Sequence, residues 1–120
     1  MAEPRPWIEG YVRAWDSNDP DDIAALFTED AVYYTEPHSR PWQGRDEIVA
    51  QWLERQDKPG EATFEWHPVC VTESAGEGVG VVQGVTTYPD KTYSNLWIIR
   101  FAPDGRCREF TEWWMRHDAK

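Results

Sequence analysis

The spacing of apolar residues changes once along this chain of 120 residues, after about residue 60. Before that point apolar residues recur at the spacing typical of helices that bury one face. After it, four stretches alternate between apolar and polar residues, and turn residues separate them. These stretches cover residues 62–73, 78–88, 92–101 and 107–117. Helices followed by a meander of strands predict an α+β fold, in which three helices pack on one face of a curved antiparallel sheet.

The first half of the chain predicts the three helices. The first covers residues 6–17, where one apolar stripe consists of Trp7, Ile8, Tyr11, Val12 and Trp15. The second begins with Asp19 as its N-cap and Pro20 at its first position, and its buried side consists of Ile23, Leu26 and Phe27. The third covers residues 45–56 and ends at Lys58-Pro59-Gly60.

A short strand and a long loop are predicted between the second and third helices. Residues 31–35 are rich in β-branched and aromatic side chains, which favours a strand. The loop that follows reaches Gly44 and contains His38, Arg40 and Trp42, residue types that often form a lid or the rim of a site. Later turns are expected at residues 74–77, 89–91 and 102–106, the last of which contains the hairpin signal Asp104-Gly105.

Size and charge favour one cytoplasmic domain, residues 1–120, that binds neither nucleic acid nor membranes. Because the net charge is −10, the chain has no excess of positive charge to neutralise the phosphates of nucleic acids or anionic membranes. Cys70 and Cys107 are too few for a disulfide framework, and we see neither a secretory signal nor a membrane span. We expect no metal and no cofactor, because the chain has neither a zinc-type ligand spacing nor a Gly-rich phosphate loop.

The last stretch, residues 107–117, carries a tryptophan on each face. Alternation puts Phe110, Glu112 and Trp114 on one face, with Arg108 and Arg116, and puts Trp113 and Met115 on the other, with Cys107, Glu109 and Thr111. A strand that is apolar on both faces is expected to lie between two apolar environments, such as a pocket and a subunit contact. Glu112 would then point into the pocket, where a carboxylate needs a partner, a proton or a catalytic role.

Several segments follow one another in an order that matches a known family. They are Tyr11 to Asp16 with Asn18-Asp19, Leu26-Phe27-Thr28-Glu29-Asp30-Ala31-Val32, Pro41-Trp42-Gln43-Gly44-Arg45-Asp46-Glu47-Ile48, and Arg100-Phe101 with Asp104-Gly105-Arg106. This series resembles the NTF2-like superfamily and, within it, the SnoaL-like and ketosteroid-isomerase-like proteins. The resemblance implies a cone that encloses one pocket, commonly in a homodimer formed through the outer face of the sheet.

The isomerase site is carried over by position. Tyr11 matches the oxyanion-hole tyrosine, which lies five residues before an aspartate, here Asp16. Glu36, before Pro37, lies about one residue from the position of the general base. Trp97 stands where the family has its second oxyanion donor, so the hole of that enzyme is incomplete here. The tryptophan of the final strand matches Trp114.

The predicted function is cofactor-independent acid–base chemistry on a small, largely apolar metabolite: isomerisation, cyclisation, dehydration or epoxide opening. The predicted catalytic residues are Glu112, Tyr11 and Glu36, and the predicted ligand contacts are Trp15, Tyr34, Trp52, Asn95, Trp97, Phe110, Trp114 and His38. Structural alternatives exist for each group: a core hydroxyl for Tyr11, a salt bridge for Glu112, a solvated rim position for Glu36 and a surface position for His38. The tryptophans can also fill the pocket themselves, and the protein would then be a non-catalytic binding or dimeric interaction module.

Overall fold

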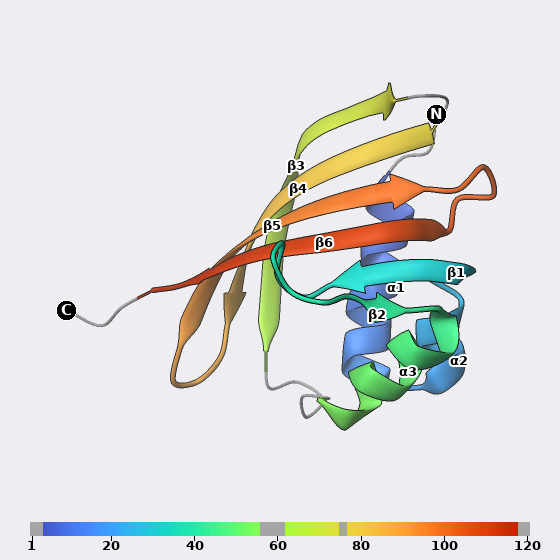
Figure 1. The fold of residues 1–120 in the computed structure, drawn as a ribbon. Coiled ribbons are helices and arrows are strands. Elements are labelled where there is room, and N and C mark those ends of the chain that lie inside the picture. Colours follow the sequence, from blue (N-terminus) through green and yellow to red (C-terminus); the bar gives the residue numbers. More distant parts are fainter. Residues whose placement is uncertain (1–3, 56–61, 75–76, 118–120) are drawn as a thin grey trace.

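The computed structural model describes residues 4–55, 62–74 and 77–117, and it has the predicted α+β fold. Three helices are present: α1 (Pro4–Ser17), α2 (Pro20–Ala24) and α3 (Arg45–Glu54). Six strands follow the order β1 (Phe27–Tyr34), β2 (Trp42–Gln43), β3 (Thr63–Ser74), β4 (Glu77–Thr87), β5 (Thr92–Phe101) and β6 (Cys107–Arg116). Figure 1 shows the helices on one side of a strongly curved sheet. The predicted helix end at Lys58-Pro59-Gly60 and part of the predicted turn at residues 74–77 lie outside the described residues.

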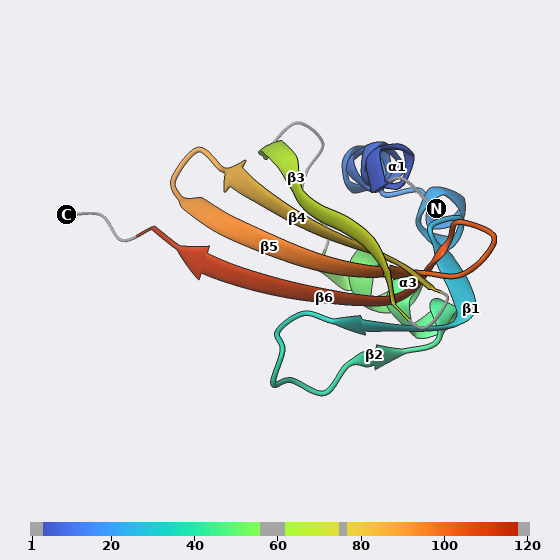
Figure 2. The same ribbon diagram turned by 90° about the horizontal axis from the view of Figure 1, so that it is seen from above.

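The six strands form one sheet in the order β2-β1-β6-β5-β4-β3. Strands β3 to β6 form the predicted antiparallel meander. The sheet is not wholly antiparallel, because β1 and β6 run parallel (Figure 2). The meander returns its last strand beside β1 in the same direction, and a parallel pair of this kind requires the long connection that the intervening elements provide.

Two local predictions between α1 and α3 hold and two differ. Asp19 caps α2 as predicted, since its side chain accepts a hydrogen bond of 2.8 Å from the Asp21 amide and Pro20 occupies the first turn. Strand β1, however, begins at Phe27, four residues before the predicted start, because the Cys107 amide donates to the Leu26 carbonyl at 2.8 Å and Phe27 pairs with Cys107. Residues Trp42–Gln43, predicted to be loop, form β2 against β1.

The core lies between the inner face of the sheet and the helices. Trp7 of α1 is buried at its centre, and its indole N–H donates to the Leu26 carbonyl at 2.8 Å. Tyr11 packs with a ring-centroid distance of 4.6 Å against Trp97 of β5, and Trp97 packs at 5.2 Å against Phe110 of β6. Such aromatic contacts contribute beyond the area they bury, so α1 is held firmly over β5 and β6.

A β-bulge lies at the start of β6. The register changes between Arg100, which pairs with Glu109, and Phe101, which pairs with Cys107, so Arg108 is the additional residue. As a result Cys107 is fully buried in the core, although strict alternation placed it on the outer face. Arg108 instead forms a two-pronged ion pair with Glu77, with 3.0 Å between Nη2 and Oε1. From Glu109 onward the predicted alternation applies.

Candidate active site

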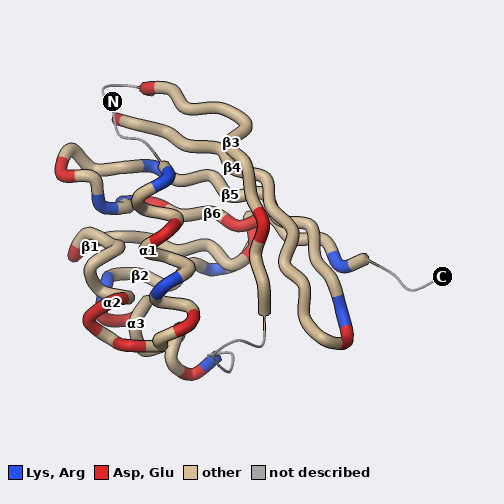
Figure 3. Tube along the Cα trace, turned by 180° about the vertical axis from the view of Figure 1, so that it is seen from behind, with Lys and Arg blue, Asp and Glu red and all other residues tan. Residues whose placement is uncertain are grey.

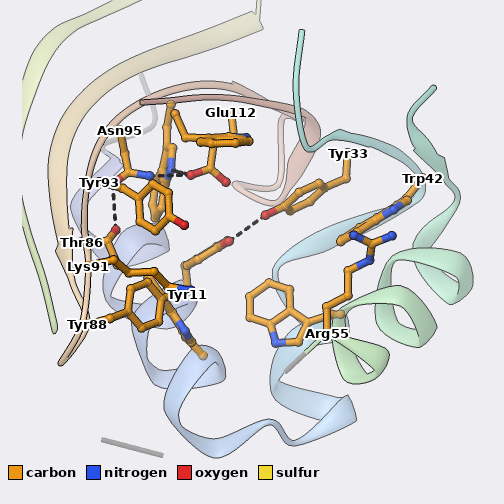
Figure 4. A pocket seen from close by; sticks show the side chains of 14 residues that line it. Tyr11, Tyr33, Trp42, Arg55, Thr86, Tyr88, Lys91, Tyr93, Asn95 and Glu112 are labelled. Atoms are coloured by element: carbon orange, nitrogen blue, oxygen red, sulfur yellow. Dashed lines mark hydrogen bonds between the residues drawn. The ribbon is translucent and has the colours of Figure 1, made fainter. Parts of the chain in front are cut away.

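The inner face of the sheet borders a cavity of about 340 Å³. Nine of its fourteen lining residues are aromatic: Tyr11, Trp15, Tyr33, Trp42, Trp52, Tyr88, Tyr93, Trp97 and Trp114. The other five are Arg55, Thr86, Lys91, Asn95 and Glu112. Figure 4 shows these side chains converging from α1, β1, β4, β5, β6 and the end of α3. A concave, aromatic site with few polar groups suits a small organic ligand.

Glu112 is the only acidic residue that the described part of the chain contributes to this lining, and its position follows from the register of β5 and β6. It pairs with Trp97, while Asn95 pairs with Trp114, so all four side chains lie on the inner face. The Glu112 Oε2 atom accepts hydrogen bonds from Asn95 Nδ2 at 2.7 Å and from Trp97 Nε1 at 3.3 Å. Because both donors use Oε2, the Oε1 atom is the one suited to exchange a proton with a ligand.

Thr86 of β4 extends this hydrogen-bond chain. Its hydroxyl donates to Asn95 Oδ1 at 2.7 Å. With its oxygen occupied by Thr86, Asn95 must present its NH2 group to Glu112. The chain Thr86, Asn95, Glu112 therefore fixes the orientation of the carboxylate from three adjacent strands, as a pre-organised site requires.

The environment of Glu112 makes it a weaker acid than usual. Burial raises the pKa of Glu112 to about 6, while the hydrogen bonds from Asn95 and Trp97 act in the opposite direction. Among the described residues Glu112 forms no ion pair with a lysine, arginine or histidine. The predicted alternative, a salt bridge across the sheet, is therefore absent from this part of the chain.

Two phenols meet on the other side of the cavity. The hydroxyls of Tyr11 on α1 and Tyr33 on β1 are 2.7 Å apart (Figure 4). Burial raises the pKa of Tyr33 well above its ordinary value, and the neighbouring Tyr11 and Glu112 add to the shift. The Tyr33 hydroxyl therefore keeps its proton at neutral pH, so the pair is a hydrogen-bond donor in an otherwise apolar wall.

Seven of the eleven predicted site residues line this cavity: Tyr11, Trp15, Trp52, Asn95, Trp97, Glu112 and Trp114. The other four do not. Phe110 is fully buried beneath the cavity. Tyr34 follows Tyr33 in β1 and therefore points to the opposite face of the sheet. Glu36 and His38 lie between β1 and β2, 3.9 Å apart between Oε2 and Nε2, and the His38 side chain is 81% exposed.

Seven lining residues were not predicted: Tyr33, Trp42, Arg55, Thr86, Tyr88, Lys91 and Tyr93. Strand alternation could have identified three of them, including Tyr93, which is two residues from Asn95 in β5. Tyr33 is two residues from the buried Ala31, and Thr86 is four residues from the buried Val82. Arg55 is three residues after the buried Trp52, so the predicted helix 45–56 already placed it near the buried face. Lys91 lies beside a hairpin turn, where sequence periodicity gives no orientation.

Within the described ranges, no group of three or more His, Cys, Asp or Glu side chains is arranged to hold a metal ion. The same part of the chain has no helix both long and apolar enough to cross a membrane.

Comparisons with known proteins agree with this architecture. Residues 8–110 match the sequence profile of the SnoaL-like domain family. No curated protein sequence matches the chain. Among solved structures, a protein from Sphaerobacter thermophilus shares 23% identity over 92% of this chain and 94% of its own, with a TM-score of 0.67.

Two further solved structures have names that state an activity. A ketosteroid isomerase candidate from Kribbella flavida gives a TM-score of 0.63 at 16% identity, over 97% of this chain and 80% of its own. An LEH-like epoxide hydrolase from M. tuberculosis gives a TM-score of 0.61 at 15% identity, over 92% of this chain and 80% of its own. At these identities the structures show a common fold.

Proposed function

Since the chain belongs to the SnoaL-like domain family, we propose that it is a cofactor-independent acid–base enzyme whose substrate is a small, largely apolar molecule bound in the aromatic cavity. The observation that carries this proposal is the environment of Glu112. A carboxylate held by two N–H donors in a cavity, with a pKa of about 6, is matched to proton transfer near neutral pH.

The reaction that these groups favour is removal and return of a proton next to a carbonyl group, as in an isomerisation. Glu112 is the general base, and Tyr11 stabilises the negative charge that develops on the carbonyl oxygen. The Trp97 indole already donates to Glu112, and Tyr33 supports Tyr11 through the shared hydrogen bond. These contacts support an oxyanion role for the phenol pair.

Epoxide opening is the second reaction type that the same groups support. There Tyr11 would donate a proton to the epoxide oxygen while Glu112 activates a water molecule. The names of the two solved structures, an isomerase candidate and an epoxide hydrolase, supply one example of each type on this fold.

Two small reporter compounds test the proposal without knowledge of the natural substrate. Hydrogen–deuterium exchange next to the carbonyl of 1-indanone, followed by NMR in D2O, reports enolisation. Hydrolysis of styrene oxide reports epoxide opening. Wild-type protein should accelerate one of these, and Glu112→Gln should lower that rate by about 100-fold or more.

Glu109→Gln is the matched control for this test. Glu109 lies on the same strand but faces outward, where its Oε2 is 3.4 Å from Arg100 Nε. The rate of this variant should stay within a factor of a few of wild type.

Glu36→Gln examines the other predicted base. A large loss there, with Glu112→Gln near wild type, would move the catalytic assignment to Glu36.

Non-catalytic ligand binding is the second candidate function, and the nine aromatic side chains of the lining favour it. Quenching of tryptophan fluorescence by a metabolite panel measures binding separately from turnover. Quenching together with no acceleration of either reporter reaction would favour a binding protein.

The outer face of the sheet supports a homodimer. Trp113 is 51% exposed and Met115 is 70% exposed on β6, and the exposed Val85 of β4 lies in the same cross-strand row as Met115. An apolar surface of this kind is rarely left in water and is suited to a symmetric contact between two copies.

We also propose a cytoplasmic location for the protein, since both cysteines are free thiols.

A further inference from the structure

Two cationic side chains reach the aromatic cavity from different elements. Lys91, between β4 and β5, has its ammonium group 5.2 Å from the centre of the Tyr88 ring and 6.0 Å from that of Tyr93. Arg55, directly after α3, has its guanidinium carbon 5.8 Å from the Trp42 ring. Figure 4 shows them on opposite sides of the cavity.

Neither cation is neutralised within the part of the chain that the structure describes. There the ion pairs join Glu36 to His38 and three arginines to acids elsewhere, and none includes Lys91 or Arg55. Contacts with ring faces hold a cation in place and leave its full charge available to a ligand.

The lining has the opposite charge balance to the whole chain. The protein carries a net charge of −10, and Figure 3 shows many of its acidic residues along α2 and α3. Among the described residues, the cavity lining instead contains two cations and one acid, and that acid, Glu112, already accepts two hydrogen bonds. Two positive charges in the walls of a cavity attract a negatively charged ligand more strongly than the same charges in open water.

We propose that the ligand of this cavity is a small carboxylate with an aromatic or otherwise apolar body. The carboxylate lies between Lys91 and Arg55, away from the negative charge of Glu112, and the apolar body packs against the tryptophan and tyrosine rings. This inference rests on the proposed function, because it names the substrate class of the same cavity. It assigns Lys91 and Arg55 to substrate binding and keeps proton transfer at Glu112.

Naphthalene-1-acetate and naphthalene-1-acetamide form a suitable probe pair, because the two compounds have nearly the same shape and differ by one negative charge. Isothermal titration calorimetry should show that wild-type protein binds the acetate about tenfold or more tightly than the amide, the scale of one charge-assisted hydrogen bond. Added salt should weaken binding of the acetate and leave that of the amide almost unchanged.

Charge-removing variants assign the effect to residues. Lys91→Gln and Arg55→Gln should each weaken acetate binding several-fold and leave amide binding within a factor of two. The matched control is Arg5→Gln, because Arg5 makes a comparable contact, 4.9 Å from the Trp66 ring, outside the cavity lining. This control changes the net charge equally and should leave both affinities unchanged.

Equal affinity for the two probes, or an acetate preference that persists in Lys91→Gln, Arg55→Gln and the double variant, would overturn the inference. So would the absence of measurable acetate binding at millimolar concentration. The proposed function is judged separately, by the reporter reactions of Glu112→Gln. A cavity that binds the amide as well as the acetate and still catalyses through Glu112 would refute the anionic substrate class alone.

Discussion

Trp97 and Glu112 are direct cross-strand partners on β5 and β6, and the Trp97 indole N–H lies 3.3 Å from Glu112 Oε2. This relationship changes the role of the position that the family resemblance assigned to a second oxyanion donor. The residue there donates its indole N–H to the carboxylate. In the proposed reaction, hydrogen-bond donation to a substrate oxygen therefore comes from the phenol pair of Tyr11 and Tyr33.

The raised pKa of Glu112 predicts a pH-dependent contribution to stability. Its pKa of about 6 in the folded state lies above the ordinary value of 4.5, so its favourable contribution is complete below pH 4.5 and is lost as the pH rises through about 6. Urea denaturation measures the free energy of unfolding of both proteins. The value for Glu112→Gln, relative to that of the wild type, should increase by up to about 2 kcal/mol between acidic and neutral pH. The same comparison for Glu109→Gln should show no such gain. A Glu112→Gln difference that is constant with pH would contradict the raised pKa.

The hydrogen-bond chain through Asn95 predicts an upward shift of that pKa in a variant. In the wild type, the 2.7 Å hydrogen bond from Asn95 to Oε2 lowers the pKa of Glu112. Asn95→Leu removes this hydrogen bond. The carboxyl resonance of Glu112, followed by ¹³C NMR across pH, should then titrate at a higher pH. Thr86→Val should shift it less, since Thr86 acts through the amide of Asn95. A lower titration midpoint in Asn95→Leu would refute this arrangement.

The two tyrosines should differ in function although they share one hydrogen bond. Tyr11→Phe and Tyr33→Phe each remove the hydrogen bond between the two hydroxyls, which should cost about 1 kcal/mol of unfolding free energy in either variant. If Tyr11 is the donor to the substrate, Tyr11→Phe should also lower kcat by about 100-fold, and Tyr33→Phe should lower it less. Equal losses of kcat in the two variants would contradict the proposal that Tyr11 donates to the substrate while Tyr33 only holds Tyr11 in place.

The outer face of the sheet predicts a dimer that a single charge disrupts. Sedimentation equilibrium of the wild type should give about twice the chain mass of 14.0 kDa, and Trp113→Glu should give the monomer mass. Trp113→Phe is the matched control, because it keeps an apolar side chain at the same exposed site and adds no charge, and it should remain a dimer. A wild-type mass of 14 kDa at micromolar concentration would contradict the dimer.

Alternation and helical spacing predicted much of this fold because they report local burial. The β5 boundaries agree with those predicted, and the pattern of residues 107–117 correctly placed Glu112 and Trp114 on the cavity side. The early start of β1 depends on pairing with a segment about 80 residues away in sequence, to which local patterns are insensitive. The bulge at Arg108 depends on the register of the β5–β6 hairpin, which strict alternation does not report.

The candidate site was predictable where a strand or helix fixes the direction of a side chain. Tyr11 and Trp97 are examples, because each belongs to a buried stripe. The sequence predicts Tyr34, but the cavity is lined by Tyr33, because the predicted strand had no partner from which to deduce its inner face. Lys91 lies in a predicted turn with no periodic context, and Arg55 lies in the last turn of the predicted third helix, so only the folded chain shows that both reach the aromatic lining.

The central claim is that Glu112 exchanges a proton with the substrate as a general base. The most direct measurement is the pH dependence of kcat/KM for the reporter reaction that the wild type accelerates. With Glu112 as the base, the rate should rise with pH and level off with a midpoint of about 6, because only the ionised carboxylate accepts a proton. A rate that is independent of pH through this range, or the same profile in Glu112→Gln, would contradict the assignment.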